Sequence, residues 1–211
     1  PFFNSPGHIL LSLAVKRQPV NLSIDFLDTF IQQQRINKAL PHIPPACVLL
    51  DIGCHRGELF KALGNKLVHG TGVDPLLSTD IHTNRYSLLK GFFPYVPKQP
   101  LEYDCITMLA VLEHIPISHQ PVIAKQCHQL LKNNGKLIIT VPSPKTDGLL
   151  KLLTGLRLIK GMSLEEHYGF DIKTVIPLFT QAGLTLLKHQ PFQWGFNNLF
   201  IFQKLYQNSN A

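Results

Sequence analysis

Two acidic residues, each at the end of a short apolar run, are the most informative chemical features of the sequence. Asp51 follows the apolar residues 48–50 and precedes a turn that contains Gly53 and Gly57. Glycines at a strand end let the main chain come close to a ligand, because they carry no Cβ atom, and the helix start beyond adds free N–H groups. The segment therefore predicts a ligand-binding turn. The alternative is a tight strand-to-helix turn that holds nothing.

The second carboxylate, Asp74, ends the segment 70–74, 23 positions after Asp51. A carboxylate in this place can accept two hydrogen bonds from the vicinal hydroxyls of a ribose. The alternative is a helix N-cap, because Pro75 follows and proline suits a first helical turn. The spacing between the two acids favours the ribose.

The residues of the first turn limit the kind of cofactor. A dinucleotide site requires G-x-G-x-x-G, so that the pyrophosphate lies on the helix end, but His55 and Glu58 occupy the second and third glycine positions. Asp51 and Glu58 also flank the place where a pyrophosphate would lie. A cationic or zwitterionic cofactor therefore fits better than a polyanion, and a nicotinamide-dependent oxidoreductase is disfavoured.

Short apolar runs and helical patterns alternate from residue 46 onward, and they predict the elements that position these acids. Continuous apolar strands separated by helices are typical of a parallel sheet covered on both faces. Turn residues at 195–198 predict that the last two strands form an antiparallel hairpin. We therefore expect an α/β sandwich with a mostly parallel sheet. The predicted strands are 47–52, 68–74, 87–90, 104–109, 137–141, 184–188 and 199–203, with helices at 57–63, at 120–131 and ending at 182–183, and a turn at 133–135.

The first part of the chain has a different character. Residues 1–43 are predicted to be an N-terminal extension with one amphipathic helix over 24–40, which begins after Ser23 and ends at Pro41. A lone helix cannot bury its apolar side, so this helix is expected to pack on the main domain, residues 44–211.

Composition excludes several classes of protein. The 211 residues are 45% hydrophobic and 16% charged, which is typical of one large folded domain and not of a disordered chain. No apolar stretch approaches the roughly 20 residues of a membrane-spanning helix. The net charge is +7, but the positive residues are scattered, so we expect no nucleic-acid-binding arm.

Cysteine usage indicates the compartment. The four cysteines form no C-x-x-C pair and no ligand spacing, so no metal site is predicted. Each lies in or beside an apolar run, where a reduced thiol packs as a small hydrophobic group. No charged segment followed by a cleavage site is visible near Pro1, and a cytoplasmic location is expected.

These segments resemble class I S-adenosylmethionine-dependent methyltransferases over residues 46–204, in particular the small-molecule type related to ubiquinone and menaquinone biosynthesis enzymes. Residues 50–54 with Gly57 are similar to the motif that holds the methionine part of the cofactor, and 72–74 to the motif whose acid binds ribose. Three further segments resemble the fourth-strand motif with its Glu-His pair, the helix-turn-strand that follows, and the closing hairpin: 103–115, 130–139 and 195–199. The resemblance implies a Rossmann-like methyltransferase sandwich with S-adenosylmethionine as its cofactor.

The resemblance also implies which residues contact that cofactor. Two positions depart from the family pattern. His55 replaces a glycine, which is expected to be tolerated if its φ stays negative, and the segment 90–94 lacks an acid for the adenine amine. Phe92 or Phe93 could cover the adenine ring instead, with core packing as the alternative for each. The predicted cofactor-binding residues are Asp51, Gly53, Cys54, His55, Gly57, Asp74, Pro75, Gly91, Phe92, Leu109 and Ala110.

The implied reaction is in-line transfer of a methyl group, for which the acceptor and the methyl must be held in line. A general base helps if the acceptor is a hydroxyl or an acidic carbon. His114 is the first candidate, because it follows the fourth strand, and His167 is the second. The alternatives are a helix-end hydrogen bond for His114 and a solvated loop position for His167.

Residues 147–161 carry a stripe of leucines with basic residues nearby, among them Arg157 and Lys160. We expect a lid over the acceptor site that favours an anionic or lipid-like small molecule, with at most peripheral membrane contact. The alternative is an ordinary surface helix packed on the sheet.

The leading hypothesis is a methyltransferase that acts on a small molecule or a biosynthetic intermediate. A nucleic-acid methyltransferase is the nearest alternative, but residues 109–112 stand where enzymes that methylate amino groups would carry an Asn or Asp-Pro-Pro-aromatic motif. A non-catalytic cofactor-binding scaffold is the third hypothesis, for which His55 is the one indication. The sequence specifies neither the acceptor nor the oligomeric state.

Overall fold

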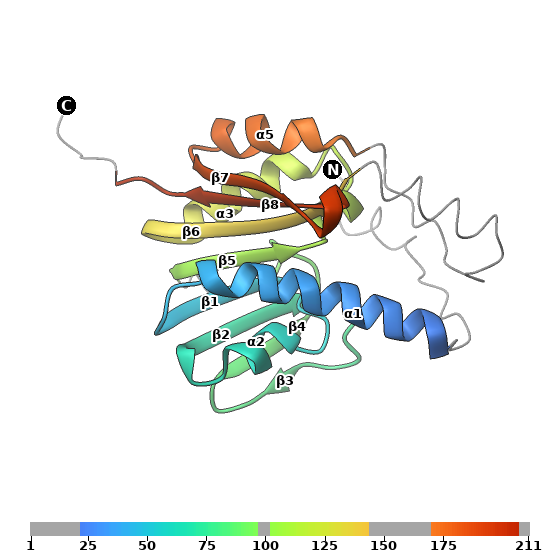
Figure 1. Cartoon of the computed structure of the whole chain (residues 1–211). Helices are drawn as coiled ribbons and strands as arrows, with labels where there is room; N and C mark the ends of the chain where they lie inside the picture. Colours follow the sequence, from blue (N-terminus) through green and yellow to red (C-terminus); the bar gives the residue numbers. More distant parts are fainter. Residues whose placement is uncertain (1–21, 97–101, 144–169, 207–211) are drawn as a thin grey trace, which may run out of the picture.

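An eight-stranded sheet forms the centre of the computed structural model, which describes residues 22–96, 102–143 and 170–206 (Figure 1). The strand order is β3-β4-β2-β1-β5-β6-β8-β7. The central pairs are parallel, whereas β8 is antiparallel to both β6 and β7, and β3 is antiparallel to β4. The predicted mostly parallel sheet with a C-terminal antiparallel hairpin is therefore confirmed. The strands are β1 (Cys47–Ile52), β2 (Leu67–Asp74), β3 (Ile81–His82), β4 (Tyr86–Lys90), β5 (Tyr103–Leu109), β6 (Leu131–Pro142), β7 (Thr185–Phe192) and β8 (Asn197–Gln203).

Helices cover both faces of this sheet, as predicted. The helices α1 (Leu22–Ala39) and α2 (Glu58–Leu63) lie on the face that is nearer the viewer in Figure 1, and α3 (Gln120–Leu130) and α5 (Val175–Gln181) on the other. Alternate side chains along each strand point to opposite faces, so the sheet separates two apolar clusters, one under each pair of helices. The molecule is thus a three-layer sandwich of the kind expected.

The N-terminal helix α1 is packed on the sheet by its last turns. Ile36 and Ala39 are buried in the same cluster as residues of β6 and β8, and the Arg35 Nε donates to Asn197 Oδ1 on β8 at 3.2 Å. This contact matches the expectation that the helix lies on the main domain. The division of the chain at residue 43 stays a prediction.

Several predicted boundaries were wrong. The expected turn at 133–135 lies inside β6. The pairing of β6 with β5 is interrupted there: it stops at Leu131 and resumes at Lys136, and Asn134 between them has a φ of +63°. Asn197 and Asn198 belong to β8 instead of the hairpin turn, which is the 3-10 turn η7 (Gln193–Gly195). The two-residue strand β3 was not predicted. Pairing with neighbouring strands makes β6 and β8 longer than predicted and creates β3. Such pairing is not visible in local sequence patterns.

Within the described ranges, no helix is long and apolar enough to cross a lipid bilayer.

The strand order determines where a ligand can bind. Both β2 and β5 pair in parallel with β1, on opposite sides of it, so the direction of strand progression reverses beside β1. In open parallel sheets a crevice forms at this point, outside the carboxyl ends of the strands. Asp51 is near the end of β1 and Asp74 is the last residue of β2, so both acids lie at this edge.

Candidate functional site

The turn after β1 is a compact loop joined to β2. The Gly53 N–H donates to the Val73 carbonyl at 2.8 Å, and the Gly57 N–H donates to the Cys54 carbonyl at 2.9 Å. Gly53 and Gly57 both have a φ of +77°, a left-handed conformation that glycine adopts without strain. A Cβ atom on Gly53 would collide with Val111 from the loop after β5. The glycine therefore allows the loops that follow β1 and β5 to meet.

The carboxylate of Asp74 is buried beneath this turn and organises it. Its Oδ2 accepts from the His55 N–H at 2.8 Å, and its Oδ1 accepts from the Leu76 N–H at 2.8 Å. No helix begins after Asp74, so the N-cap alternative is wrong and the side chain closes a turn instead. An ionised carboxylate has about four acceptor positions, so it retains capacity for two ligand hydroxyls.

Asp51 is the second buried carboxylate of the site. Its Oδ1 accepts a hydrogen bond from Thr107 Oγ1 on β5 at 2.6 Å. Burial raises the pKa of Asp51 to about 7; the Thr107 hydrogen bond opposes this shift, and the negative charges of Asp74 and Glu58 add to it. The site thus has a concentration of negative potential, which favours a positively charged ligand group.

Because the pKa of Asp51 is higher in the folded than in the unfolded chain, folding binds a proton between about pH 4 and pH 7. The contribution of this group to stability is complete below pH 4 and decreases as the pH rises to 7. We expect Asp51→Asn to have a greater free energy of unfolding than the parent at pH 8, by on the order of a few kcal/mol, and a smaller advantage at pH 5. Urea unfolding at both pH values measures this difference. An advantage of equal size at pH 5 and pH 8 would contradict the assignment.

His55 does not have the negative φ that was given as the condition for tolerating a side chain in this turn. Its φ is +48°, so a side chain occupies a left-handed position that costs on the order of 1 kcal/mol for most residues. The imidazole is half exposed, with Nδ1 3.3 Å from Glu58 Oε1 at the start of α2. The ring therefore extends toward α2 and solvent, while the main-chain N–H of His55 holds Asp74.

Replacement of His55 by glycine should relieve this strain. We expect His55→Gly to raise the free energy of unfolding by roughly 0.5–1 kcal/mol, because glycine adopts a positive φ freely. The matched control is Arg56→Gly, at the neighbouring exposed position without a positive φ, which should lower it by about as much. Denaturant unfolding of the two variants decides the point. A loss of stability in His55→Gly equal to that of the control would exclude strain at this position.

The structure places the other predicted cofactor-binding residues along the same edge. Gly91 N–H donates to the Asp74 carbonyl at 3.2 Å, and Phe92 follows it, partly exposed, while Phe93 is buried. The Cys54 side chain is buried, so only its main chain can face a ligand, and burial raises the pKa of its thiol. Pro75 is exposed beside Asp74.

On the other side of β1, Leu109 ends β5 and Ala110 follows with a φ of +57°. The Ala110 N–H donates to the Thr140 carbonyl of β6 at 2.8 Å, which fixes this loop. His114 is the last residue of the 3-10 turn η5 (Leu112–His114) and is partly buried, on the loop that contacts Gly53 through Val111. His167 and the expected lid at 147–161 lie outside the described residues.

Sequence reasoning missed four residues of this edge. Thr107 holds Asp51, and Val111 packs against Gly53. Thr140 Oγ1 and Ser143 Oγ, at the end of β6, are buried and have no hydrogen-bond partner within the described part of the chain. A hydroxyl in an otherwise apolar strand was the available signal for Thr107 and Thr140. Buried hydroxyls without partners are rare and call for a ligand or another explanation.

Thr107 and Thr140 form a natural pair for a stability test. We expect Thr140→Val to raise the free energy of unfolding by about 1 kcal/mol, because it removes an unsatisfied buried hydroxyl without changing the side-chain shape. Thr107→Val should lower it by roughly 1–3 kcal/mol, since it deprives Asp51 of a hydrogen bond. Thermal and urea unfolding compare the two. Destabilisation by both variants would mean that Thr140 has a structural partner.

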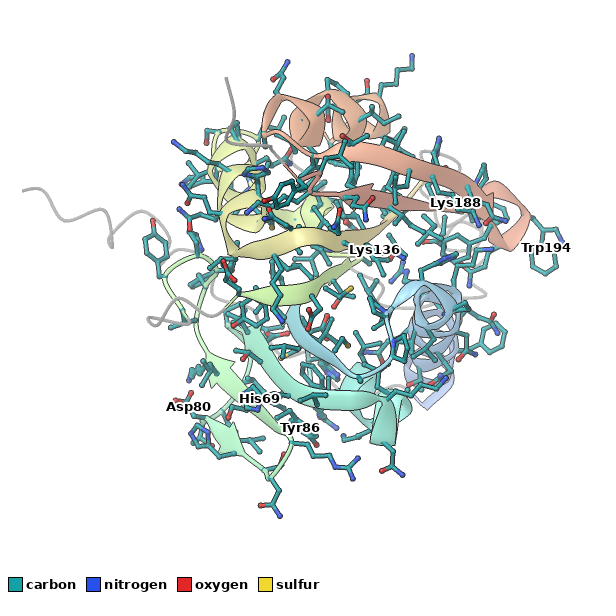
Figure 2. The ribbon with its side chains drawn as sticks, turned by 90° about the vertical axis from the view of Figure 1, so that its left-hand side faces the viewer. His69, Asp80, Tyr86, Lys136, Lys188 and Trp194 are labelled. Carbon is teal, nitrogen blue, oxygen red and sulfur yellow. The ribbon has the colours of Figure 1, made fainter. Side chains whose placement is uncertain are left out.

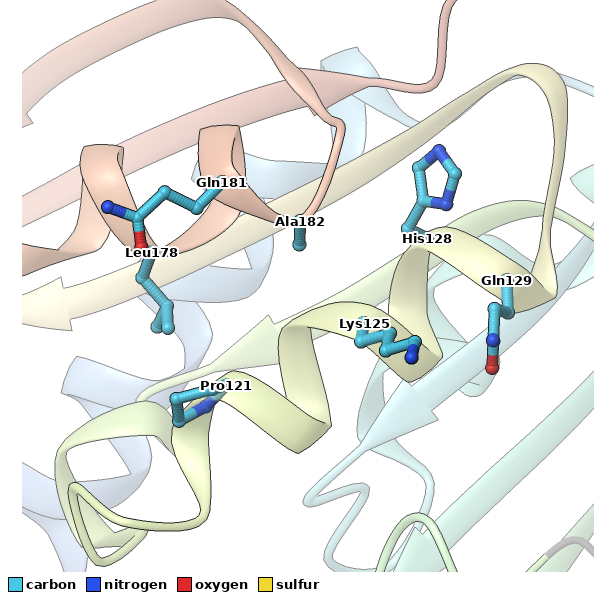
Figure 3. Close-up of a pocket in the computed structure, with 7 residues that line it drawn as sticks. All are labelled: Pro121, Lys125, His128, Gln129, Leu178, Gln181 and Ala182. Atoms are coloured by element: carbon cyan, nitrogen blue, oxygen red, sulfur yellow. The ribbon is translucent and has the colours of Figure 1, made fainter.

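A separate groove lies between α3 and α5, on the far face of the sheet (Figure 3). Its lining includes Lys125, His128 and Gln181, and burial together with Lys204 lowers the pKa of His128. Because α3 starts at the carboxyl edge and runs back along the sheet, His128 near its end is distant from Asp51 and Asp74. This groove is therefore not part of the site at the carboxyl edge.

Residues 25–189 match a family model described as a methyltransferase domain. The match includes most of α1, the two acid-bearing strands and most of the sheet. The chain belongs to this family, as the sequence motifs predicted.

Curated relatives agree with this result. The chain is 28% identical over 132 residues to a ubiquinone biosynthesis O-methyltransferase of Saccharophagus degradans, covering 58% of this chain and 55% of that protein. It is 25% identical over 154 residues to the protein of the same name from Klebsiella pneumoniae, covering 67% and 62%. The chain thus spans little more than half the length of these relatives.

Solved structures share the fold. A magnesium protoporphyrin IX methyltransferase from Synechocystis with bound S-adenosylhomocysteine has a TM-score of 0.61 at 17% identity, covering 90% of each chain. An N-methyltransferase of Bradyrhizobium japonicum has a TM-score of 0.58 at 16% identity, covering 88% of this chain and 100% of that one. The sheet and its covering helices are therefore those of a Rossmann-like methyltransferase.

Proposed function

We propose that this protein is an S-adenosylmethionine-dependent methyltransferase that acts on a small molecule or a biosynthetic intermediate. The observation that carries the proposal is the meeting of two buried carboxylates, Asp51 and Asp74, at a left-handed glycine turn beside β1. It occurs at the ligand-binding crevice of a methyltransferase-family fold. The relatives named ubiquinone biosynthesis O-methyltransferase support the same function.

The residues at this edge fit such a cofactor. S-adenosylmethionine, when bound, supplies a methyl group on a positively charged sulfonium. Asp74 would accept hydrogen bonds from the ribose hydroxyls through the free acceptor positions of its carboxylate. The negative potential around Asp51 suits the positive groups of the methionine part, and Gly53 and Gly57 leave room for it.

The chain's own contribution to the reaction is chiefly positioning. The leaving sulfur is neutral, so rate depends on holding the acceptor in line with the methyl group. We assign the role of general base to His114, whose loop is fixed to β6 through Ala110 and packed on Gly53 through Val111. His167 remains the second candidate for the same role.

The acceptor is proposed to lie beside the end of β6. The hydroxyls of Thr140 and Ser143 would hydrogen-bond its polar atoms, which would explain why both are buried without partners in the described chain. An anionic or lipid-like small molecule is the proposed acceptor class, in keeping with the net charge of +7. We also propose a cytoplasmic location, which the four buried free thiols support.

Calorimetry with S-adenosylhomocysteine tests the proposal. Asp74→Ala should weaken binding by at least about tenfold, because it removes charge-assisted hydrogen bonds to the ribose. Asp74→Asn retains one acceptor oxygen and the side-chain shape, so it serves as a second variant if the alanine form folds poorly. The matched control is Asp80→Ala, an exposed acid near the same edge that accepts from the Lys90 N–H.

Binding of S-adenosylhomocysteine that is equal in the parent, in both Asp74 variants and in the control would refute the ribose assignment. Tight binding in the parent without methyl transfer to any compound of a cell extract would instead favour the non-catalytic scaffold.

A further inference from the structure

Trp194 is the most exposed large apolar side chain of the described residues, at 94%. It lies in the turn η7 between β7 and β8, and Figure 2 shows its indole projecting past the ribbon into solvent. An aromatic surface of this size is unfavourable in water, and here a tryptophan in a left-handed conformation presents it. It is also the one tryptophan in the chain.

The turn that presents Trp194 is strained, and hydrogen bonds hold it. Gln193, Trp194 and Gly195 have φ values of +50°, +54° and +86°, and only the last is a glycine. The Asn197 side chain donates to the Gln193 side chain, and the Phe196 N–H donates to the Gln193 carbonyl at 3.0 Å. A left-handed tryptophan is uncommon, and strain of this kind persists where neighbouring contacts hold it.

Contacts with α1 and β6 determine where this turn points. Phe192 and Pro142 both pair with Asn197, so the turn is level with the end of β6, at the same carboxyl edge as Asp51 and Asp74. The Arg35 Nε donates to Asn197 Oδ1 at 3.2 Å, which ties the turn to α1. The turn therefore lies at the carboxyl edge, and the Trp194 indole projects from it on the side of the sheet that α1 covers (Figure 2).

Basic side chains of α1 and β7 lie behind the turn. The Lys38 Nζ lies 5.9 Å from the centre of the Phe192 ring. Burial lowers the pKa of His42, and the charges of Lys188, which is exposed on the edge strand β7, of Lys38 and of Lys136 lower it further, so these lysines lie around one residue. An aromatic tip with cations behind it is complementary to an anionic lipid surface, where indole rings occupy the headgroup region and lysines attract anionic lipids.

We propose that the Trp194 turn is a membrane-contact element that inserts its indole into the interface of an anionic lipid bilayer, with Lys38 and Lys188 facing the headgroups. The contact would then lie at the end of the sheet that also holds the candidate site, because the turn is level with the end of β6. This proposal rests on the geometry of the turn and does not require methyl transfer.

Phosphatidylcholine vesicles, with and without phosphatidylglycerol, provide the test on the full chain. Because Trp194 is the one tryptophan, its emission reports its own environment. We expect a shift of the emission to shorter wavelength and co-sedimentation with the phosphatidylglycerol vesicles, both decreasing as salt is added. Absence of the shift and of co-sedimentation would overturn the proposal.

Variants separate the aromatic and the charged contributions. Trp194→Ala should bind these vesicles at least about tenfold more weakly, at unchanged melting temperature and unchanged S-adenosylhomocysteine affinity. Lys188→Glu should weaken binding, whereas Lys66→Glu, the same charge change on an exposed residue at the amino end of β2, should not. If Lys188→Glu and Lys66→Glu weaken vesicle binding equally, net charge alone explains the binding, and the assignment of Lys188 to the contact is overturned.

A second copy of this chain is the competing occupant of the Trp194 surface. Sedimentation velocity without vesicles distinguishes the two. If the parent is larger than Trp194→Ala at the same concentration, the turn is a self-association contact and the lipid proposal fails. Equal size together with vesicle binding supports it.

Discussion

Burial of the Asp51 carboxylate at the end of β1 is the constraint on which the site depends. A carboxylate taken out of water needs a hydrogen-bond donor, and Thr107 of the neighbouring strand supplies one at 2.6 Å. That bond joins β1 to β5 where the strand order reverses. The nearby charges of Asp74 and Glu58 oppose ionisation of Asp51, so the edge is prepared for a positively charged ligand group.

The turn above Asp51 shows how the main chain meets this constraint. Gly53 allows Val111 to pack against it, and the N–H of His55 donates to Asp74 from a residue in a left-handed conformation. A glycine in that position would be unstrained. The hydrogen bond to Asp74 holds the strained main chain of His55 in place, and the His55 ring is directed toward Glu58.

The side of the sheet covered by α1 connects the candidate site with the hairpin turn. Arg35 links α1 to β8, and the same residue of β8, Asn197, holds the turn that carries Trp194. The candidate acceptor hydroxyl of Thr140 lies between these elements and β5. The proposed cofactor and acceptor residues share one edge, because parallel strands bring their carboxyl ends together. The turn that carries Trp194 joins them there because β8 runs antiparallel to β6.

The sequence by itself determined the alternation of strands and helices, the closing hairpin, and the two acids with their glycine turn, because apolar periodicity and glycine positions are local signals. It did not determine the role of Thr107, the packing of Val111 on Gly53 or the unpaired hydroxyl of Thr140, since each depends on which strands become neighbours. The sign of φ at His55 and the exposure of Trp194 were likewise decided by tertiary contacts. Side chains distant in sequence meet only through strand register, and register depends on the whole sheet.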